Sequence, residues 1–267
     1  MTLLSARTAR KFTVDGITIN VPTMDEAISS IVSAVQQGQT FSVCTLNLDH
    51  VVHLSSRDDF RHAYRRARFV TADGFPIVVL GRLAKVPIRR TTGADLVEPI
   101  CEEASRRGLS IFLLGSDDAT LAESSNRLCE RFPGLQIAGT YSPPRGFDPY
   151  APEADEAIER VRASKARICF LALGSPKQEI FATRCLDRIP GTGLLCIGAS
   201  LDFIAGTQVR APRFAQQFGL EWLWRAMLNP KRLTPRYARC VAALPRLLAN
   251  TIPQIIDARM GTLRWRQ

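Results

Sequence analysis

Residues 168–181 read ICFLALGSPKQEIF, an apolar run that ends in a polar elbow. The apolar residues 168–173, together with Arg167 before them, have the length and composition of a buried strand in a parallel sheet, predicted at Arg167–Leu173. Gly174 allows the chain to turn, Pro176 suits the first turn of a helix, and a Lys-Gln-Glu triplet follows. The stretch therefore predicts a strand, a tight turn and a helix, which together form the repeating unit of an α/β sheet.

The same alternation extends along most of the chain. Further strands are predicted at Thr40–Leu46, Arg68–Thr71, Ser110–Leu114, Gln136–Thr140 and Leu194–Gly198, and helices at Met24–Gln37, Asp49–Ala67, Gly93–Arg107, Ala119–Phe132, Glu153–Ala163 and Pro176–Arg188. A short hairpin that turns at Asp15-Gly16 precedes them. We expect a Rossmann-like, mostly parallel sheet flanked by helices over residues 1–206 and a helical, basic C-terminal appendage over residues 207–267.

The charge supports this division. The 267 residues carry a net charge of +10. Residues 1–206 hold 24 Lys and Arg against 23 Asp and Glu, whereas residues 207–267 hold 11 against two. A basic block at one end of a chain indicates an anionic partner, which could be nucleic acid, anionic lipid or a diphosphate. The alternative is a solvated basic face.

The C-terminal segment is also amphipathic. Its apolar residues fall on one face at helical spacing, with tryptophans nearby: Trp222, Trp224, Val241, Leu244, Leu247, Leu248, Ile252, Ile255 and Ile256. A basic amphipathic helix of this kind is typical of membrane surfaces. The alternative is a helix that packs on the core or against a second copy. No apolar run is long enough to span a membrane, and the N-terminus lacks a leader-like apolar stretch, so we expect a cytoplasmic protein.

Ligands of open α/β sheets bind outside the carboxyl ends of the strands. At the elbow, backbone N–H groups and Lys177 would attract an anion, while Gln178 and Glu179 could bond a sugar or base. The alternative is an ordinary helix cap formed by Ser175 and Gln178. After another strand, Asp73 could act as a general base, or it could be a turn or capping aspartate.

The pair Arg89-Arg90 could bind a diphosphate, or it could lie in a solvated loop. No glycine-rich dinucleotide or P-loop motif is present, which disfavours an oxidoreductase. The seven cysteines are scattered inside apolar segments, which predicts reduced, buried thiols. His50 and His53 lack a third ligand at a useful spacing, so we expect imidazoles that are at the helix surface or partly buried, and no D-x-D motif occurs. We therefore predict no metal or other cofactor. A nucleic-acid binder is disfavoured because the first three quarters of the chain are nearly neutral and the tail has an apolar face.

An ordered set of short motifs resembles the WecG/TagA/CpsF glycosyltransferases (glycosyltransferase family 26). The motifs are T-x-N-x-D (Thr45–Asp49), A-D-G (Ala72–Gly74), R-x-x-G-x-D (Arg90–Asp95), G-S-P-K-Q-E (Gly174–Glu179), G-A-x-x-D-F-x-A-G (Gly198–Gly206), R-A-P (Arg210–Pro212), E-W-x-x-R (Glu221–Arg225) and N-P-x-R…R-Y (Asn229–Tyr237). Each motif is short, but their order is specific and extends over residues 12–240.

The resemblance implies an inverting, metal-independent enzyme on the inner face of the bacterial cell membrane. It would transfer a sugar from a UDP-sugar to a sugar on a polyprenyl diphosphate. Asp73 would be the general base, with Thr45 beside it. The donor site would comprise Asn47, Gly174, Lys177, Gln178, Glu179, Gly198 and Asp202. Residues for the acceptor or a diphosphate would be Arg90, Asp95, Arg210, Arg225, Arg232 and Arg236.

The resemblance leaves the sugars open. We favour a UDP-hexose such as UDP-glucose for exopolysaccharide assembly, with UDP-N-acetylmannosamine or its uronic acid as the alternative. The C-terminal element is also compatible with dimers or trimers, in which a neighbouring copy would complete the site.

Overall fold

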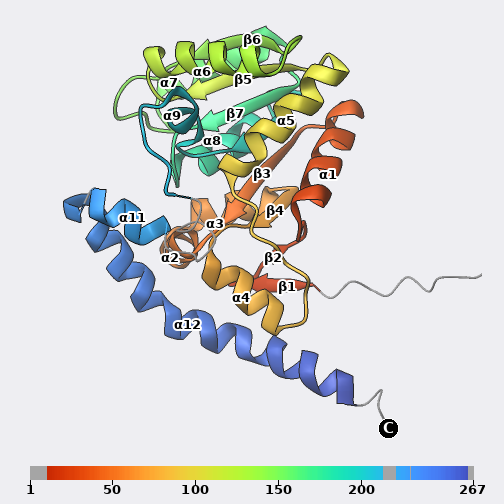
Figure 1. The fold of residues 1–267 in the computed structure, drawn as a ribbon, viewed down its shortest axis with the longest axis vertical. Coiled ribbons are helices and arrows are strands. Elements are labelled where there is room, and N and C mark those ends of the chain that lie inside the picture. The colour runs from red at the N-terminus through yellow and green to blue at the C-terminus, as the bar shows by residue number, and fades with distance from the viewer. Residues whose placement is uncertain (1–10, 213–220, 229, 264–267) are drawn as a thin grey trace, which may run out of the picture.

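A six-stranded parallel sheet forms the centre of the molecule (Figure 1). The computed structural model describes residues 11–212, 221–228 and 230–263. The strands lie in the order β4-β3-β8-β7-β5-β6. Their bounds are β3 (Phe41–Leu46), β4 (Phe69–Ala72), β5 (Ser110–Gly115), β6 (Gln136–Tyr141), β7 (Ile168–Ala172) and β8 (Gly193–Cys196). The predicted fold class, a parallel α/β sheet with a C-terminal helix, is confirmed.

Strand β3 has a special place in this order. It lies between β4, the next strand of the sheet along the chain, and β8, the last one. The chain therefore passes from β3 to β4 on one side of it and comes back later to form β8 on its other side. The loops after these three strands, which are far apart in the sequence, lie next to one another at the end of the sheet. Such a point in an open sheet is where ligands bind.

Helices cover both faces of the sheet because alternate strand residues are apolar on both sides. Ile111 and Leu113 belong to one buried cluster, whereas Phe112 and Leu114 belong to the other. The cluster that contains Ile111 and Leu113 is completed by side chains of four helices: α1 (Met24–Gln36), α5 (Gly93–Arg107), α6 (Asp118–Arg131) and α9 (Ser200–Ala205). The cluster that contains Phe112 and Leu114, on the other face of the sheet, includes side chains of five helices: α2 (Leu48–Ser56), α3 (Asp58–Arg66), α4 (Phe75–Leu83), α7 (Pro152–Ser164) and α8 (Lys177–Cys185).

Three details differ from the sequence-based prediction. The helix expected over residues 49–67 is two helices, α2 and α3, because Arg57 between them has an extended backbone with φ of −138°. Helices α4 and α9 were not predicted. His50 is fully buried rather than at the helix surface or partly buried, and Cys129 is exposed although the seven cysteines, all free thiols, were expected to be buried.

The described part of the C-terminal segment contains two helices, α11 (Glu221–Leu228) and α12 (Pro230–Leu263), and α12 packs on the core. Helix α12 runs past α2, α4 and the predicted hairpin, whose strands are β1 (Phe12–Val14) and β2 (Ile17–Ile19) (Figure 1). Leu247 is buried in the same apolar cluster as the hairpin. None of the helices in the described part of the chain has both the length and the apolar content needed to cross a bilayer.

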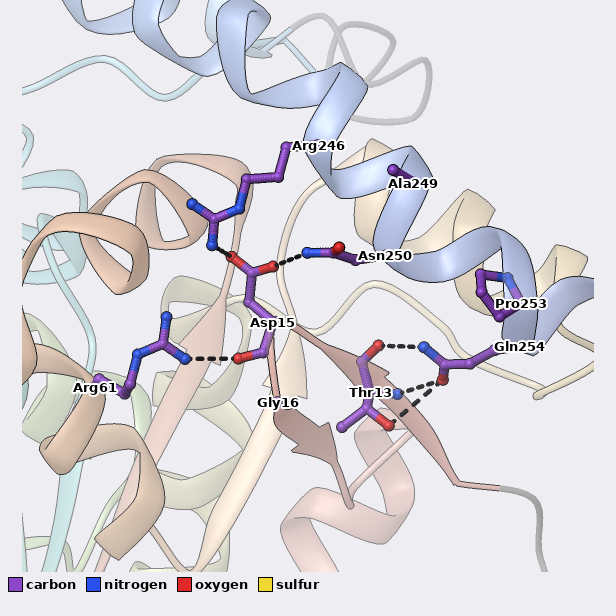
Figure 2. Close-up of a pocket in the computed structure, with 9 residues that line it drawn as sticks. All are labelled: Thr13, Asp15, Gly16, Arg61, Arg246, Ala249, Asn250, Pro253 and Gln254. Atoms are coloured by element: carbon purple, nitrogen blue, oxygen red, sulfur yellow. Dashed lines mark hydrogen bonds and ion pairs between the residues drawn. The ribbon is translucent and has the colours of Figure 1, made fainter.

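Figure 2 shows the groove between α12 and the hairpin, a cavity of about 510 Å³. Its polar groups bind one another. The buried Asp15 carboxylate accepts hydrogen bonds from Arg246 at 2.9 Å and Asn250 at 2.7 Å. Gln254 accepts from the backbone N–H of Thr13 at 3.0 Å and donates to its C=O at 2.8 Å, thereby pairing with the free edge of β1. These contacts fasten α12 to the hairpin.

Leu247→Ala should destabilise the whole molecule. The Leu247 side chain is 0% exposed, whereas that of its neighbour Leu248 is 45% exposed. Removing a buried leucine costs about 2–5 kcal/mol, because transfer free energy is lost and a cavity remains. Leu248→Ala is the matched control and should change stability by about 0.5 kcal/mol or less. Urea unfolding measures both. Equal effects would contradict the packing of α12 on the core.

Candidate active site

Loops that follow five of the strands converge at the carboxyl edge of the sheet. Hydrogen bonds join them in pairs. Asn47, after β3, reaches Asp73 after β4. The backbone N–H of Gly198, after β8, donates to Gln178 after β7 at 3.0 Å. The Ser116 hydroxyl, after β5, donates to Asp202 of α9 at 2.8 Å. Two hydrogen-bonded groups of loops therefore lie along this edge, one after β3 and β4 and the other after β5, β7 and β8.

Asp73 is held on both sides by backbone bonds. Its own N–H donates to the C=O of Leu46 at 2.8 Å, and the N–H of Thr91 donates to the C=O of Ala72 at 2.8 Å. Gly74, with φ of +100°, caps helix α4, so Asp73 is not the capping residue of that helix. The backbone thus fixes Asp73 where β4 ends and leaves its half-buried carboxylate at the strand edge.

Asn47 orients this carboxylate. Its side-chain oxygen accepts from the N–H of His50 at 3.0 Å, which caps α2, while its Nδ2 lies 3.5 Å from Asp73 Oδ2. Thr45 precedes it by two residues in β3, is buried, and pairs in register with Thr71, two residues before Asp73. Asn47 and Asp73 therefore follow adjacent strands and lie within 3.5 Å of each other, and Thr45 lies in the same pair of strands.

The elbow turns its amide and carboxyl groups inward. Gly174 has φ of +72°, the Ser175–Pro176 peptide is cis, and α8 begins at Lys177 without a side-chain cap, so the ordinary capping alternative is not what forms. Gln178 is buried, and its Nε2 donates to Glu179 Oε1 at 2.8 Å. A relay therefore runs from the Gly198 N–H through Gln178 to Glu179.

Glu179 is 1% exposed, and its second oxygen, Oε2, is buried without a hydrogen-bond partner in the described part of the chain, as is the Ser175 hydroxyl. Burial raises the pKa of the Glu179 carboxyl to about 7, and the hydrogen bond from Gln178 offsets only part of that effect. Near neutral pH this carboxyl is therefore partly protonated, and it lies at the base of the elbow.

Glu179→Gln should change how stability depends on pH. Between the ordinary pKa of 4.5 and the folded value of about 7, the native protein holds a proton that the unfolded chain releases. Stability is therefore highest at the low end of this window and falls by about 3 kcal/mol as the pH rises through it. The glutamine variant should lose this slope, whereas Glu98→Gln, on the surface of α5 with a half-exposed side chain, should keep it. Urea unfolding across the window decides this, and parallel curves for wild type and Glu179→Gln would contradict it.

An ion-pair cluster lies where the chain enters α5, next to Thr91, whose backbone N–H bonds the C=O of Ala72. Arg90 contacts Asp95 at 3.6 Å and Glu221 of α11 at 3.4 Å, and Arg210 also binds Asp95. Burial opposes the charge of Asp95, but the two arginines outweigh it and lower the pKa of its carboxyl. Gly93, the first residue of α5, lets this helix begin against the backbone that follows β8, because a Cβ there would lie 2.7 Å from the Ile197 Cα.

A second cluster joins α12 to the first turn of α2. Asp49 binds Arg236 at 2.8 Å and His53 at 3.5 Å. Burial again opposes the charge, but His53 and Arg236 hold the pKa of the Asp49 carboxyl well below its usual range. Burial lowers the pKa of the adjacent His50 to about 3, so this imidazole is neutral and bonds the Tyr64 hydroxyl at 2.6 Å.

The structure thus brings most of the predicted residues to one edge of the sheet. Lys177 is half-buried at the start of α8. The side chains of Arg225 and Arg232 lie outside the described residues. Two ion pairs were not predicted, that of Arg90 with Glu221 and that of Asp49 with Arg236, although Glu221 begins the E-W-x-x-R motif. No three His, Cys, Asp or Glu side chains of the described ranges form a group that could hold a metal ion.

One comparison with known proteins bears on this site. The model of the "Glycosyl transferase WecG/TagA/CpsF family" matches residues 12–259. The match begins at the first residue of β1 and continues into the last turns of α12, so it includes every loop of the site and both C-terminal helices.

Proposed function

The chain belongs to the WecG/TagA/CpsF glycosyltransferase family, and we propose that it transfers a sugar, with inversion, from a UDP-sugar to a polyprenyl-diphosphate-linked sugar. As a glycosyltransferase it uses a nucleotide-sugar donor and a sugar acceptor. UDP-glucose is the donor that we favour, and UDP-N-acetylmannosamine or its uronic acid is the alternative. The polymer would be a bacterial exopolysaccharide or another cell-surface polymer.

The observation that carries this proposal is the position of Asp73. Its carboxylate stands at the edge where the loops of β3, β4 and β8 meet, and Asn47 orients it. In the proposed reaction Asp73 takes the proton of the acceptor hydroxyl while that oxygen attacks the anomeric carbon. The bond from this carbon to the UDP oxygen breaks in the same step. One displacement inverts the configuration, so an α-linked donor gives a β-linked product.

The departing UDP needs positive charge around its diphosphate. The N-terminal end of α8, with the positive end of its dipole, lies at the strand edge, and Lys177 stands at the first position of that helix. Arg90 would supply a guanidinium, and its neighbour Thr91 is bonded through the backbone to Ala72, the residue before Asp73. These groups support a mechanism in which protein charges, rather than a metal ion, stabilise the leaving group. Gln178, Gly198 and Asp202 would line the donor side.

We further propose that α12 docks on the inner face of the cell membrane. Its buried side, with Cys240, Leu247, Thr251 and Ala258, packs on the core, while its outer side exposes a row of apolar residues: Val241, Leu248, Ile252, Ile256 and Met260. Trp222, Leu223 and Met227 of α11 are also exposed. An apolar stripe on a segment with a net charge of +9 suits an anionic lipid surface.

A transfer assay tests the proposal. Purified protein is mixed with each of several UDP-sugars and a short lipid-diphosphate-sugar acceptor, with and without EDTA, and the product is identified by mass. We expect one donor to add one sugar mass and EDTA to leave the rate unchanged. Inhibition by EDTA that Mg²⁺ reverses would contradict the metal-independent mechanism. Absence of both transfer and UDP binding would contradict the proposed donor.

A further inference from the structure

His50 is a buried polar side chain that the proposed reaction does not use. It lies in the first turn of α2 and is 3% exposed. Its Nδ1 lies 2.6 Å from the Tyr64 hydroxyl, and its ring meets the rings of Phe60 and Tyr64 edge-on, with centroids 5.5 Å and 5.9 Å away. Phe60 and Tyr64 both belong to α3 and are themselves buried. The imidazole therefore fastens the start of α2 to α3.

The imidazole is neutral, so it serves as a hydrogen-bonding group and not as a charge. Burial lowers its pKa to about 3, although the nearby Asp49 carboxylate acts in the opposite direction. A neutral imidazole has one N–H and one bare nitrogen, and in a buried position both need a partner. The Tyr64 hydroxyl binds Nδ1, and the backbone of Thr45 acts on the ring and raises its pKa, as an accepting C=O does. The ring thus interacts with β3 as well as with α3.

The backbone of the same residue sets the direction of the Asn47 side chain. The His50 N–H donates to Asn47 Oδ1 at 3.0 Å. A side-chain amide has an accepting oxygen at one end and a donating NH2 at the other. With its oxygen bound in the turn, Asn47 directs its NH2 toward Asp73, and its Nδ2 lies 3.5 Å from Asp73 Oδ2. The place in which the His50 ring holds this turn therefore decides where the amide meets the carboxylate.

We propose that the His50 side chain is a positioning residue of the active site. It holds the first turn of α2 against α3, and this turn aims the Asn47 amide at the Asp73 carboxylate. The inference rests on the proposed function, in which Asp73 is the general base, and adds to it a residue that acts through Asn47. The elbow belongs to the other hydrogen-bonded group of loops, through the bond of Gln178 with Gly198. Loss of the His50 ring should therefore slow the chemical step and spare binding of the donor.

His50→Leu tests this role, because leucine fills a similar space but cannot bind the Tyr64 hydroxyl. Transfer by the full chain is measured with the best UDP-sugar, so that kcat and the KM for the donor are obtained separately. A misplacement of about 1 Å can cost about a hundredfold in rate, so we expect a smaller shift to lower kcat about tenfold and to leave the donor KM within about twofold. His50→Gln, whose neutral amide both donates and accepts, should keep at least about half of the wild-type kcat. His62→Leu makes the same change at an exposed position of α3 and should leave both constants unchanged.

Tyr64→Phe tests the same contact in a variant that keeps the buried ring and loses only the hydroxyl. We expect kcat to fall about threefold, the size of one net hydrogen bond. Urea unfolding and calorimetric binding of UDP report whether each variant is folded. Wild-type kcat in folded His50→Leu and Tyr64→Phe, or a raised donor KM at unchanged kcat, would overturn the positioning role, while transfer by the wild type keeps the proposed function in place. A wild type that neither transfers sugar nor binds UDP would overturn both.

Discussion

Asp73→Asn should abolish sugar transfer and leave UDP binding intact. Asparagine has the size of aspartate and can keep the contact with Asn47 through a flipped amide, but it cannot accept the acceptor's proton. A positioned general base contributes about 10²–10⁴ to the rate, so we expect a loss on the order of a thousandfold. The rate is measured by product mass over time with the best donor, and UDP affinity is measured by calorimetry.

Two further variants separate catalysis from folding. Asp25→Asn makes the same chemical change at an exposed position of α1 and should leave the rate unchanged. Asn47→Ala removes the group that orients the carboxylate and should lower the rate less than Asp73→Asn does. A near-normal rate of transfer by Asp73→Asn would show that Asp73 is not the general base. Loss of UDP binding in the same variant would instead give it a role in the donor site.

Much of the fold could be predicted because most strands are short apolar runs and most helices place their apolar residues at a helical period. Prediction failed where tertiary packing overrides local signals. Arg57 breaks the helix over residues 49–67 although no glycine or proline marks that position. Helix α4 reads FPIVVLGRL, which is apolar on most sides and contains proline and glycine, so its sequence lacks the usual amphipathic pattern.

The edge at which the site lies was predictable from strand ends alone, and Asn47 and Asp73 meet there because β3 and β4 are neighbours. What the sequence could not provide was the direction of the elbow side chains. Gln178 and Glu179 are polar, and nothing local indicates that both face the core. Contacts such as Arg90–Glu221 join residues more than a hundred positions apart, and only the path of α11 brings them together.

The outer face of α12 makes the second large prediction. Leu248→Glu combined with Ile252→Glu should release the protein from vesicles of phosphatidylcholine and phosphatidylglycerol. Both side chains are exposed and lie on the apolar stripe, so the change should not disturb the buried side that holds α12 to the core. Losing two apolar contacts with the bilayer and adding two negative charges should lower the vesicle partition coefficient by about a hundredfold. Flotation of the vesicles measures the bound fraction.

The matched control carries the same change in charge at the other end of the molecule. Asn126→Glu with Gln136→Glu places two carboxylates on exposed positions of α6 and β6, away from α12 (Figure 1). This control should keep nearly all of its vesicle binding, because its two new carboxylates lie away from α12. The net charge falls by the same amount in both variants, so a difference between them reports on the position of the change. Both variants should transfer sugar to a short water-soluble acceptor at the wild-type rate. Equal release of the two variants would mean that net charge alone accounts for vesicle binding. Full binding by Leu248→Glu/Ile252→Glu would mean that the membrane-binding surface is not the outer face of α12.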